Sequence, residues 1–201
     1  DISGRGGWQQ GPPLSEEQYN LEDALVVAQW LNVFLRKCDV LKMACVAQIV
    51  NTISPLTTRG DQLLKQTTHY PIALVSSHAR GVALDALTQA PPHETRRYGP
   101  LPALDVSASY DAAQDRGAVF VVNRSATPVA TEVVWQGTAP QQVVGGYQLG
   151  GTDLKVANTF AQPDTIVPQS LDGGQLRNGR LTLALPPLSF TVMITGGYTQ
   201  H

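Results

Sequence analysis

Two amide side chains lie close together at the end of one apolar stretch. Residues 40–51 read VLKMACVAQIVN, a run that is almost wholly apolar until Gln48 and Asn51. A primary amide offers a hydrogen-bond donor and an acceptor together, and sugar hydroxyls need both. Gln48 is therefore a candidate sugar ligand. The alternative is a glutamine whose amide is satisfied by the neighbouring backbone.

A second candidate is Trp8, which stands alone in residues 1–13, a segment of Gly, Pro, Arg and Gln that predicts a loop. The face of a sugar can pack on an aromatic ring, so Trp8 is a weaker candidate for substrate binding. The alternative is a tryptophan that only pins the loop.

The remaining reactive residue types form no pattern typical of a metal or nucleotide site. No glycine-rich nucleotide motif is present, and the four histidines lie at no ligand-like spacing. Cys38 and Cys45 lack the CxxC spacing of a zinc site, so we expect two small buried hydrophobic side chains. The sequence therefore predicts neither a metal nor a cofactor.

Composition points to an ordinary globular protein. The 201 residues are 42% hydrophobic and 15% charged, with a net charge of −2. No basic block suggests nucleic-acid binding, and no apolar run approaches the ~20 residues of a membrane span. The sequence does not open with a basic segment followed by an apolar one, so no signal peptide is visible.

The amides need elements that position them. A short apolar run without polar alternation predicts a strand buried on both faces, as in a parallel sheet. In α/β barrels the carboxyl ends of such strands carry the chemistry, which is where Gln48 lies. One strand cannot make a parallel sheet, so we expect the other strands of a barrel to come from outside this chain.

Helices flank the run. Residues 15–18 fit a capping box and an apolar stripe follows, which predicts a helix to about Lys37. A second helix is expected within residues 61–79, with a break at Tyr70 and a restart that places Pro71 in the first turn.

From residue 81 the pattern changes to short β-rich runs separated by Gly, Pro, Asn and Asp. This pattern predicts an antiparallel sandwich, with turns at residues 111–117 and at Asn178-Gly179. The runs are residues 106–110, 118–123, 130–135, 142–149, 181–185 and 189–195.

An ordered set of short motifs resembles the C-terminal third of family 51 glycoside hydrolases, the α-L-arabinofuranosidases. The set covers nearly the whole chain and includes PPL at 12–14, KMACVAQIVN at 42–51, QT at 66–67, VVNR at 121–124, KVANT at 155–159, NGRLT at 178–182 and LPPLSF at 185–190.

The resemblance implies a fold of α/β plus all-β class. Residues 1–80 would be the last part of a catalytic (β/α)8 TIM barrel, completed by a missing N-terminal portion. Residues 81–201 would be a jelly-roll-like antiparallel β-sandwich. It also implies a retaining, cofactor-free enzyme that releases terminal α-L-arabinofuranosyl residues from arabinan, arabinoxylan and arabino-oligosaccharides. Gln48 would reach the bound arabinose, and Asn51 would have a structural role closing the strand.

The family's acid/base and nucleophilic glutamates belong to earlier strands, and their motif does not occur here. We therefore expect no catalytic residue in this chain, and we expect the chain to be inactive and unstable when it is alone. The expected partner is the N-terminal portion of the same enzyme, separated by a cleavage or break ahead of Trp8. We further expect a homo-oligomer of the complete enzyme, a cytoplasmic location, and no nucleic-acid or membrane partner.

Two alternatives stay open. The chain could be a carbohydrate-binding or structural β-sandwich module without catalysis, with residues 1–80 as a helical appendage. It could also belong to a related barrel-plus-sandwich glycoside hydrolase, such as a xylosidase or an endoglucanase.

Overall fold

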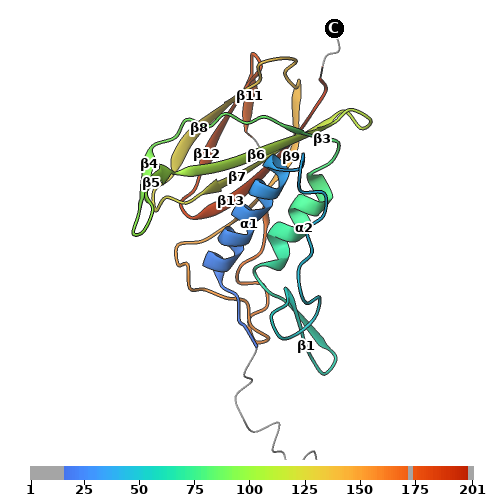
Figure 1. The fold of residues 1–201 in the computed structure, drawn as a ribbon, viewed down its shortest axis with the longest axis vertical. Coiled ribbons are helices and arrows are strands. Elements are labelled where there is room, and N and C mark those ends of the chain that lie inside the picture. The colour runs from blue at the N-terminus through green and yellow to red at the C-terminus, as the bar shows by residue number, and fades with distance from the viewer. Residues whose placement is uncertain (1–15, 172–173, 199–201) are drawn as a thin grey trace, which may run out of the picture.

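The described part of the chain, residues 16–171 and 174–198 of a computed structural model, forms two antiparallel sheets covered by two helices. Helices α1 (Leu21–Arg36) and α2 (His69–His78) lie on one face of the larger sheet (Figure 1). That sheet has the strand order β10 (Gln169–Ser170), β9 (Gln142–Gly150), β13 (Ser189–Gly196), β7 (Arg116–Asn123), β6 (Leu104–Asp111) and β3 (Val82–Leu84).

The smaller sheet completes the sandwich on the opposite face. Its three strands follow the order β11 (Gln175–Arg177), β12 (Arg180–Leu185) and β8 (Val129–Val134). Two hairpins stand apart from both sheets: β1 (Leu56–Arg59) with β2 (Gln62–Lys65), and β4 (Pro92–Thr95) with β5 (Gly99–Pro102).

The predicted antiparallel sandwich is confirmed. All six predicted β-rich runs are strands, namely β6, β7, β8, β9, β12 and β13. The predicted turn at Asn178-Gly179 joins β11 to β12, with φ of 50° and 71° at its two residues. Two consecutive positive φ values are what a two-residue hairpin turn of type I′ requires, and Asn-Gly adopts them readily.

Alternation along β7 divides the core in two. Phe120 and Val122 face the helices, while Val119 and Val121 face the smaller sheet. Successive side chains of a strand point to opposite faces, so a sheet covered on both sides needs apolar residues at every position. The run of apolar residues in β7 therefore reflects a central antiparallel strand between two packed layers.

Helix α1 begins later than predicted. Asn20 is its N-cap: Asp23 N donates to Asn20 Oδ1 over 3.2 Å, and Asn20 N donates to Asp23 Oδ2 over 2.9 Å. The capping box predicted at residues 15–18 is wrong, because Asn20 and Asp23 supply the same reciprocal bonds further along the chain. The predicted apolar stripe is confirmed, since Leu21 and Ala28 are fully buried.

The second helix also differs from the prediction. Helix α2 starts at His69 and passes through Tyr70 without a break, with Pro71 in its first turn as predicted. Residues 62–65, predicted as helix, form strand β2 instead. A two-residue turn with Gly60 at φ 60° folds this segment back on β1, which takes it out of any helix.

Candidate functional site

The run predicted to be a buried strand is exposed. Residues 41–49 belong to no strand, and Met43 and Ile49 are 79% and 75% exposed. A β-bridge between Val50 and Leu56 joins the end of the run to β1. The prediction of a strand buried on both faces is therefore wrong for the described structure, because the described residues leave both sides of the run uncovered.

The two cysteines share this exposure. Cys38 follows α1 and Cys45 lies within the run, and both are free and exposed. The prediction that they are small buried hydrophobic side chains is wrong, since the cover expected for them is absent from the described residues. No group of three or more His, Cys, Asp or Glu side chains in the described ranges is placed to hold a metal ion.

Gln48 lies near the carboxyl end of the exposed run. Its side chain is exposed, and its amide has no hydrogen-bond partner among the described residues. The amide is therefore not satisfied by neighbouring backbone here, and it can offer a donor and an acceptor to a ligand. Trp8, the other candidate, lies outside the described residues.

Asn51 ends the run and ties it to the β1–β2 hairpin. Its Oδ1 accepts from the backbone N–H of Thr58 over 2.8 Å and from Thr58 Oγ1 over 3.2 Å. Its Nδ2 donates to Thr58 Oγ1 over 3.1 Å, and its backbone N–H donates to Leu56 O over 2.7 Å. The role expected for Asn51, closing the end of the run, agrees with these contacts.

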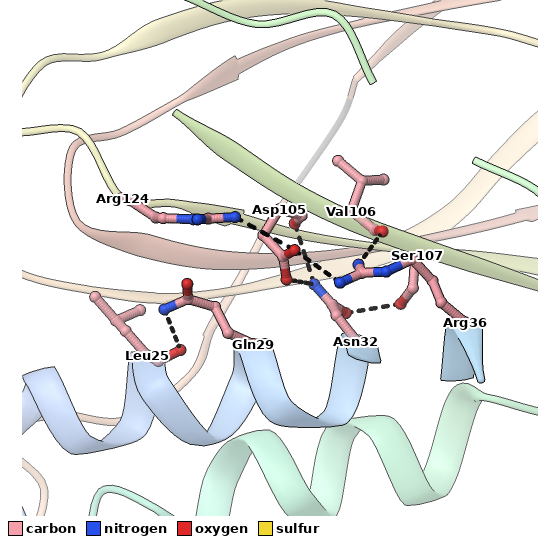
Figure 2. Close-up of polar contacts among 8 residues, drawn as sticks. All are labelled: Leu25, Gln29, Asn32, Arg36, Asp105, Val106, Ser107 and Arg124. Atoms are coloured by element: carbon pink, nitrogen blue, oxygen red, sulfur yellow. Dashed lines mark hydrogen bonds and ion pairs between the residues drawn. The ribbon is translucent and has the colours of Figure 1, made fainter. Parts of the chain in front are cut away.

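A second polar cluster joins α1 to the larger sheet. The Asp105 carboxylate on β6 accepts from Arg36 Nη2 over 3.0 Å and from Asn32 Nδ2 over 3.0 Å (Figure 2). Arg124 Nη2 lies 3.3 Å from the same carboxylate, and Ser107 Oγ donates to Asn32 Oδ1 over 2.7 Å. Asn32 is fully buried and Asp105 is 9% exposed.

This cluster is structural rather than catalytic. Both oxygens of Asp105 are occupied by donors from Asn32, Arg36 and Arg124, which leaves no open acceptor for a ligand. Sequence reasoning missed the cluster because Asn32 and Arg36 on α1 lie about 70 residues before their partner Asp105 on β6. One signal was available: Asn32 is a polar residue four positions after Ala28 on the buried stripe of α1.

Two histidines pack on the body of the fold. Burial lowers the pKa of His69, and the nearby Lys65 lowers it further. Burial also lowers the pKa of His78, with a smaller contribution from Arg80, and the His78 ring stacks on Tyr147 at a centroid distance of 5.5 Å. Neither histidine lies in a described cluster of metal-ligating residues.

Helix α1 has a second apolar stripe, opposite the buried one. Val26, Trp30 and Val33 recur at helical spacing and are 39%, 59% and 43% exposed. A helix that is apolar on two opposite faces is typical of one packed between two bodies. The sandwich covers one face of α1, and the described chain leaves the other open. No helix in the described ranges has the length and hydropathy to cross a bilayer.

Residues 5–189 match the family described as the α-L-arabinofuranosidase C-terminal domain. The chain belongs to this family. It is 38% identical over 185 residues to an intracellular exo-α-(1→5)-L-arabinofuranosidase of Streptomyces lividans, an alignment that covers 91% of this chain and 28% of the relative. The corresponding Bacillus subtilis enzyme is 30% identical, with 92% of this chain and 37% of the relative covered.

The structure agrees with this membership. A family 51 α-L-arabinofuranosidase from Bifidobacterium longum superposes with a TM-score of 0.85 and 32% identity, covering 92% of this chain and 36% of that one. The chain thus matches a C-terminal portion of a family 51 enzyme and spans about a third of the length of these relatives.

Proposed function

We propose that this chain is the C-terminal part of a retaining α-L-arabinofuranosidase, an enzyme that releases terminal α-L-arabinofuranosyl residues from arabinan, arabinoxylan and arabino-oligosaccharides. The observation that carries the proposal is the family match over residues 5–189. The chain aligns with about a third of the length of relatives that are named exo-α-(1→5)-L-arabinofuranosidases. The relatives' names also support an intracellular location for the complete enzyme.

The exposed apolar surface supports a missing partner. The run at residues 40–50 and the outer stripe of α1 both present large apolar side chains to solvent, Met43 and Trp30 among them. Leaving such surface open is costly and marks a site of association. We propose that the N-terminal portion of the enzyme covers it and completes a (β/α)8 barrel. Residues 1–80 then belong to the barrel, and residues 81–201 form the sandwich domain.

The chemistry is divided between the two portions. A retaining glycosidase needs two carboxyl groups about 5–5.5 Å apart, one to protonate the leaving oxygen and one to form the glycosyl-enzyme. We assign both glutamates to the N-terminal portion. Gln48 contributes a hydrogen-bonding amide to the arabinose, which suits a side chain that is exposed and has no partner among the described residues. Trp8 contributes stacking.

Reconstitution tests this proposal. The 201-residue chain alone should not hydrolyse an aryl α-L-arabinofuranoside, and co-expression with the N-terminal portion should restore hydrolysis. Full activity of the chain alone would refute the division of chemistry. A substrate panel that includes aryl xylosides and β-glucans separates an arabinofuranosidase from a xylosidase or an endoglucanase.

Gln48→Ala in the reconstituted enzyme tests the assigned side chain. Loss of one buried hydrogen bond to the sugar should cost roughly 1–3 kcal/mol of transition-state binding, or about 5- to 150-fold in kcat/KM. Gln142→Ala, at an exposed position on β9, is the matched control and should leave kcat/KM unchanged. An unaltered kcat/KM in the Gln48 variant would remove this residue from the site.

One observation favours a second function, a sandwich module without catalysis. Both helices share a buried core with the larger sheet, so the described residues form one packed body with its own interior. A module of this kind would be monodisperse alone and would not bind the N-terminal portion in size-exclusion chromatography.

A further inference from the structure

The turn after the exposed run is an unusual piece of backbone. Asn51 and Thr52 have φ of 63° and 61°, two consecutive residues in the left-handed region. Asparagine tolerates this conformation, whereas a β-branched threonine adopts it only when its surroundings enforce it. The enforcing contacts are Ser54 N to Asn51 O at 3.1 Å and Glu17 N to Thr52 O at 2.9 Å. The chain reverses here and brings β1 back beside the end of the run.

The hairpin that receives Asn51 is firmly mounted. Gln66, which is 3% exposed, donates through Nε2 to Ser54 O over 2.9 Å and to Thr57 Oγ1 over 3.1 Å. Its Oε1 accepts from Tyr19 N over 2.8 Å. The side chain of Thr67 donates to Asn20 O over 2.6 Å. The hairpin base is therefore fixed to the segment that leads into α1.

The described hydrogen bonds of the run lie at its two ends. At the amino end, Val40 N and Leu41 N donate to Lys37 O over 3.1 and 2.8 Å, just after α1. Residues 41–49 pair with no strand in the described structure, whereas Val50 and Asn51 are bonded to β1 through the Leu56 bridge and the Thr58 contacts. Gln48 lies only three residues before Asn51. The direction in which the chain carries Gln48 out of the turn thus depends on how Asn51 is fixed to Thr58.

We propose that Asn51 is a positioning residue, which holds the end of the run against the rigid β1–β2 hairpin so that the Gln48 amide points at the sugar. This inference rests on the proposed function, because it assigns Asn51 a task only if Gln48 contacts substrate. A small displacement of a group that orients substrate can cost up to about 100-fold in rate, so the effect should be visible in catalysis.

Two variants of the reconstituted enzyme separate positioning from general stability. Asn51→Gly keeps the left-handed backbone available and removes every side-chain bond to Thr58. Its kcat/KM for an aryl α-L-arabinofuranoside should fall roughly 10- to 100-fold. Asn51→Asp keeps the acceptor for the Thr58 N–H and also tolerates the left-handed region, so it should recover most of the activity.

A double-mutant cycle with Gln48→Ala is the deciding experiment. If Asn51 acts through Gln48, then Asn51→Gly should reduce kcat/KM little further in the Gln48→Ala background. Multiplicative losses, or a Gly variant as active as wild type, would overturn the positioning role. A reconstituted wild type without arabinofuranosidase activity would instead refute the proposed function, and the positioning role with it.

Discussion

Strand β7 and the run at residues 40–50 look alike in sequence and differ completely in their surroundings. Both are nearly continuous apolar stretches of strand length. In β7, Phe120 and Val122 are fully buried, whereas Val40 and Met43 in the run are 76% and 79% exposed. Strand β7 lies between β6 and β13 and is covered by α1 on one face and by β12 on the other.

The difference shows that an apolar pattern indicates that a segment needs to be buried, but does not indicate which part of the protein buries it. Strand β7 meets its requirement inside the described chain. The run at residues 40–50 does not. Its described hydrogen bonds lie at its two ends, to Lys37 after α1 and, through Val50 and Asn51, to β1. The same composition therefore marks a finished core in one place and an open surface in the other.

The chain's two methionines give the largest test of this contrast. Met193 in β13 is fully buried, and Met43 in the run is 79% exposed. In the 201-residue chain, Met193→Ala should reduce the free energy of unfolding by roughly 2–5 kcal/mol, because it leaves a cavity. Met43→Ala should change it by less than about 0.5 kcal/mol. Urea denaturation followed by circular dichroism measures both.

The difference in unfolding free energy between the Met193→Ala and Met43→Ala variants should become smaller when the N-terminal portion is present. If that portion covers the run, Met43→Ala in the complete enzyme should also cost about 2 kcal/mol or more. Equal and negligible losses at Met43 in both settings would mean that the run stays exposed.

The contacts that hold α1 on the sandwich give the next largest effect. Asp105→Asn removes the charge shared by Arg36 and Arg124, whose side chains are 32% and 19% exposed. Breaking a buried ion cluster costs about 3–5 kcal/mol, and partial exposure of the arginines reduces the expected loss to about 2 kcal/mol. Glu132→Gln, which breaks the exposed pair with Arg180, is the control and should cost under about 1 kcal/mol. Comparable losses for the two variants would contradict the structural role of the cluster.

The smallest effect concerns pH. Burial, and then Arg80, lowers the pKa of His78 below its usual value, so the unfolded chain takes up a proton at a higher pH than the folded chain. The stability that this histidine contributes is present above the unfolded pKa of about 6.5 and is lost as pH falls through the folded pKa. His78→Gln should therefore flatten the fall in melting temperature between about pH 7 and pH 5. An unchanged slope would show that His78 does not drive it.

The sandwich could be predicted from sequence because its signals are local. Turn residues such as Asn178-Gly179 separate runs of the right length, and both layers that cover β7 come from within the chain. Strands β4 and β5 escaped prediction because Pro92 and Pro102 stand at the ends of their hairpin, where proline normally argues against a strand.

The candidate site was less predictable. Gln48 could be proposed from its residue type and position, and what it binds stays a prediction. The hairpin at residues 56–65 was missed because residues 62–65 fit a helix as well as a strand, and only the turn at Gly60 decides between them. The contacts of Asn32, Arg36 and Asp105 join distant segments, and no local pattern announces a partner some 70 residues away.

The position of β13 governs the order in which this molecule can be completed. It follows every other described strand in the chain, yet it sits in the middle of the larger sheet, between β9 and β7. During synthesis, β9 and β7 cannot pair with β13 until β13 has been made. The sheet face on which α1 packs is incomplete until then. Long-range pairing of this kind is slow and leaves strand edges open meanwhile. A chain that ends before residue 189 would therefore lack the centre of its larger sheet and leave the edges of β9 and β7 that face β13 unpaired.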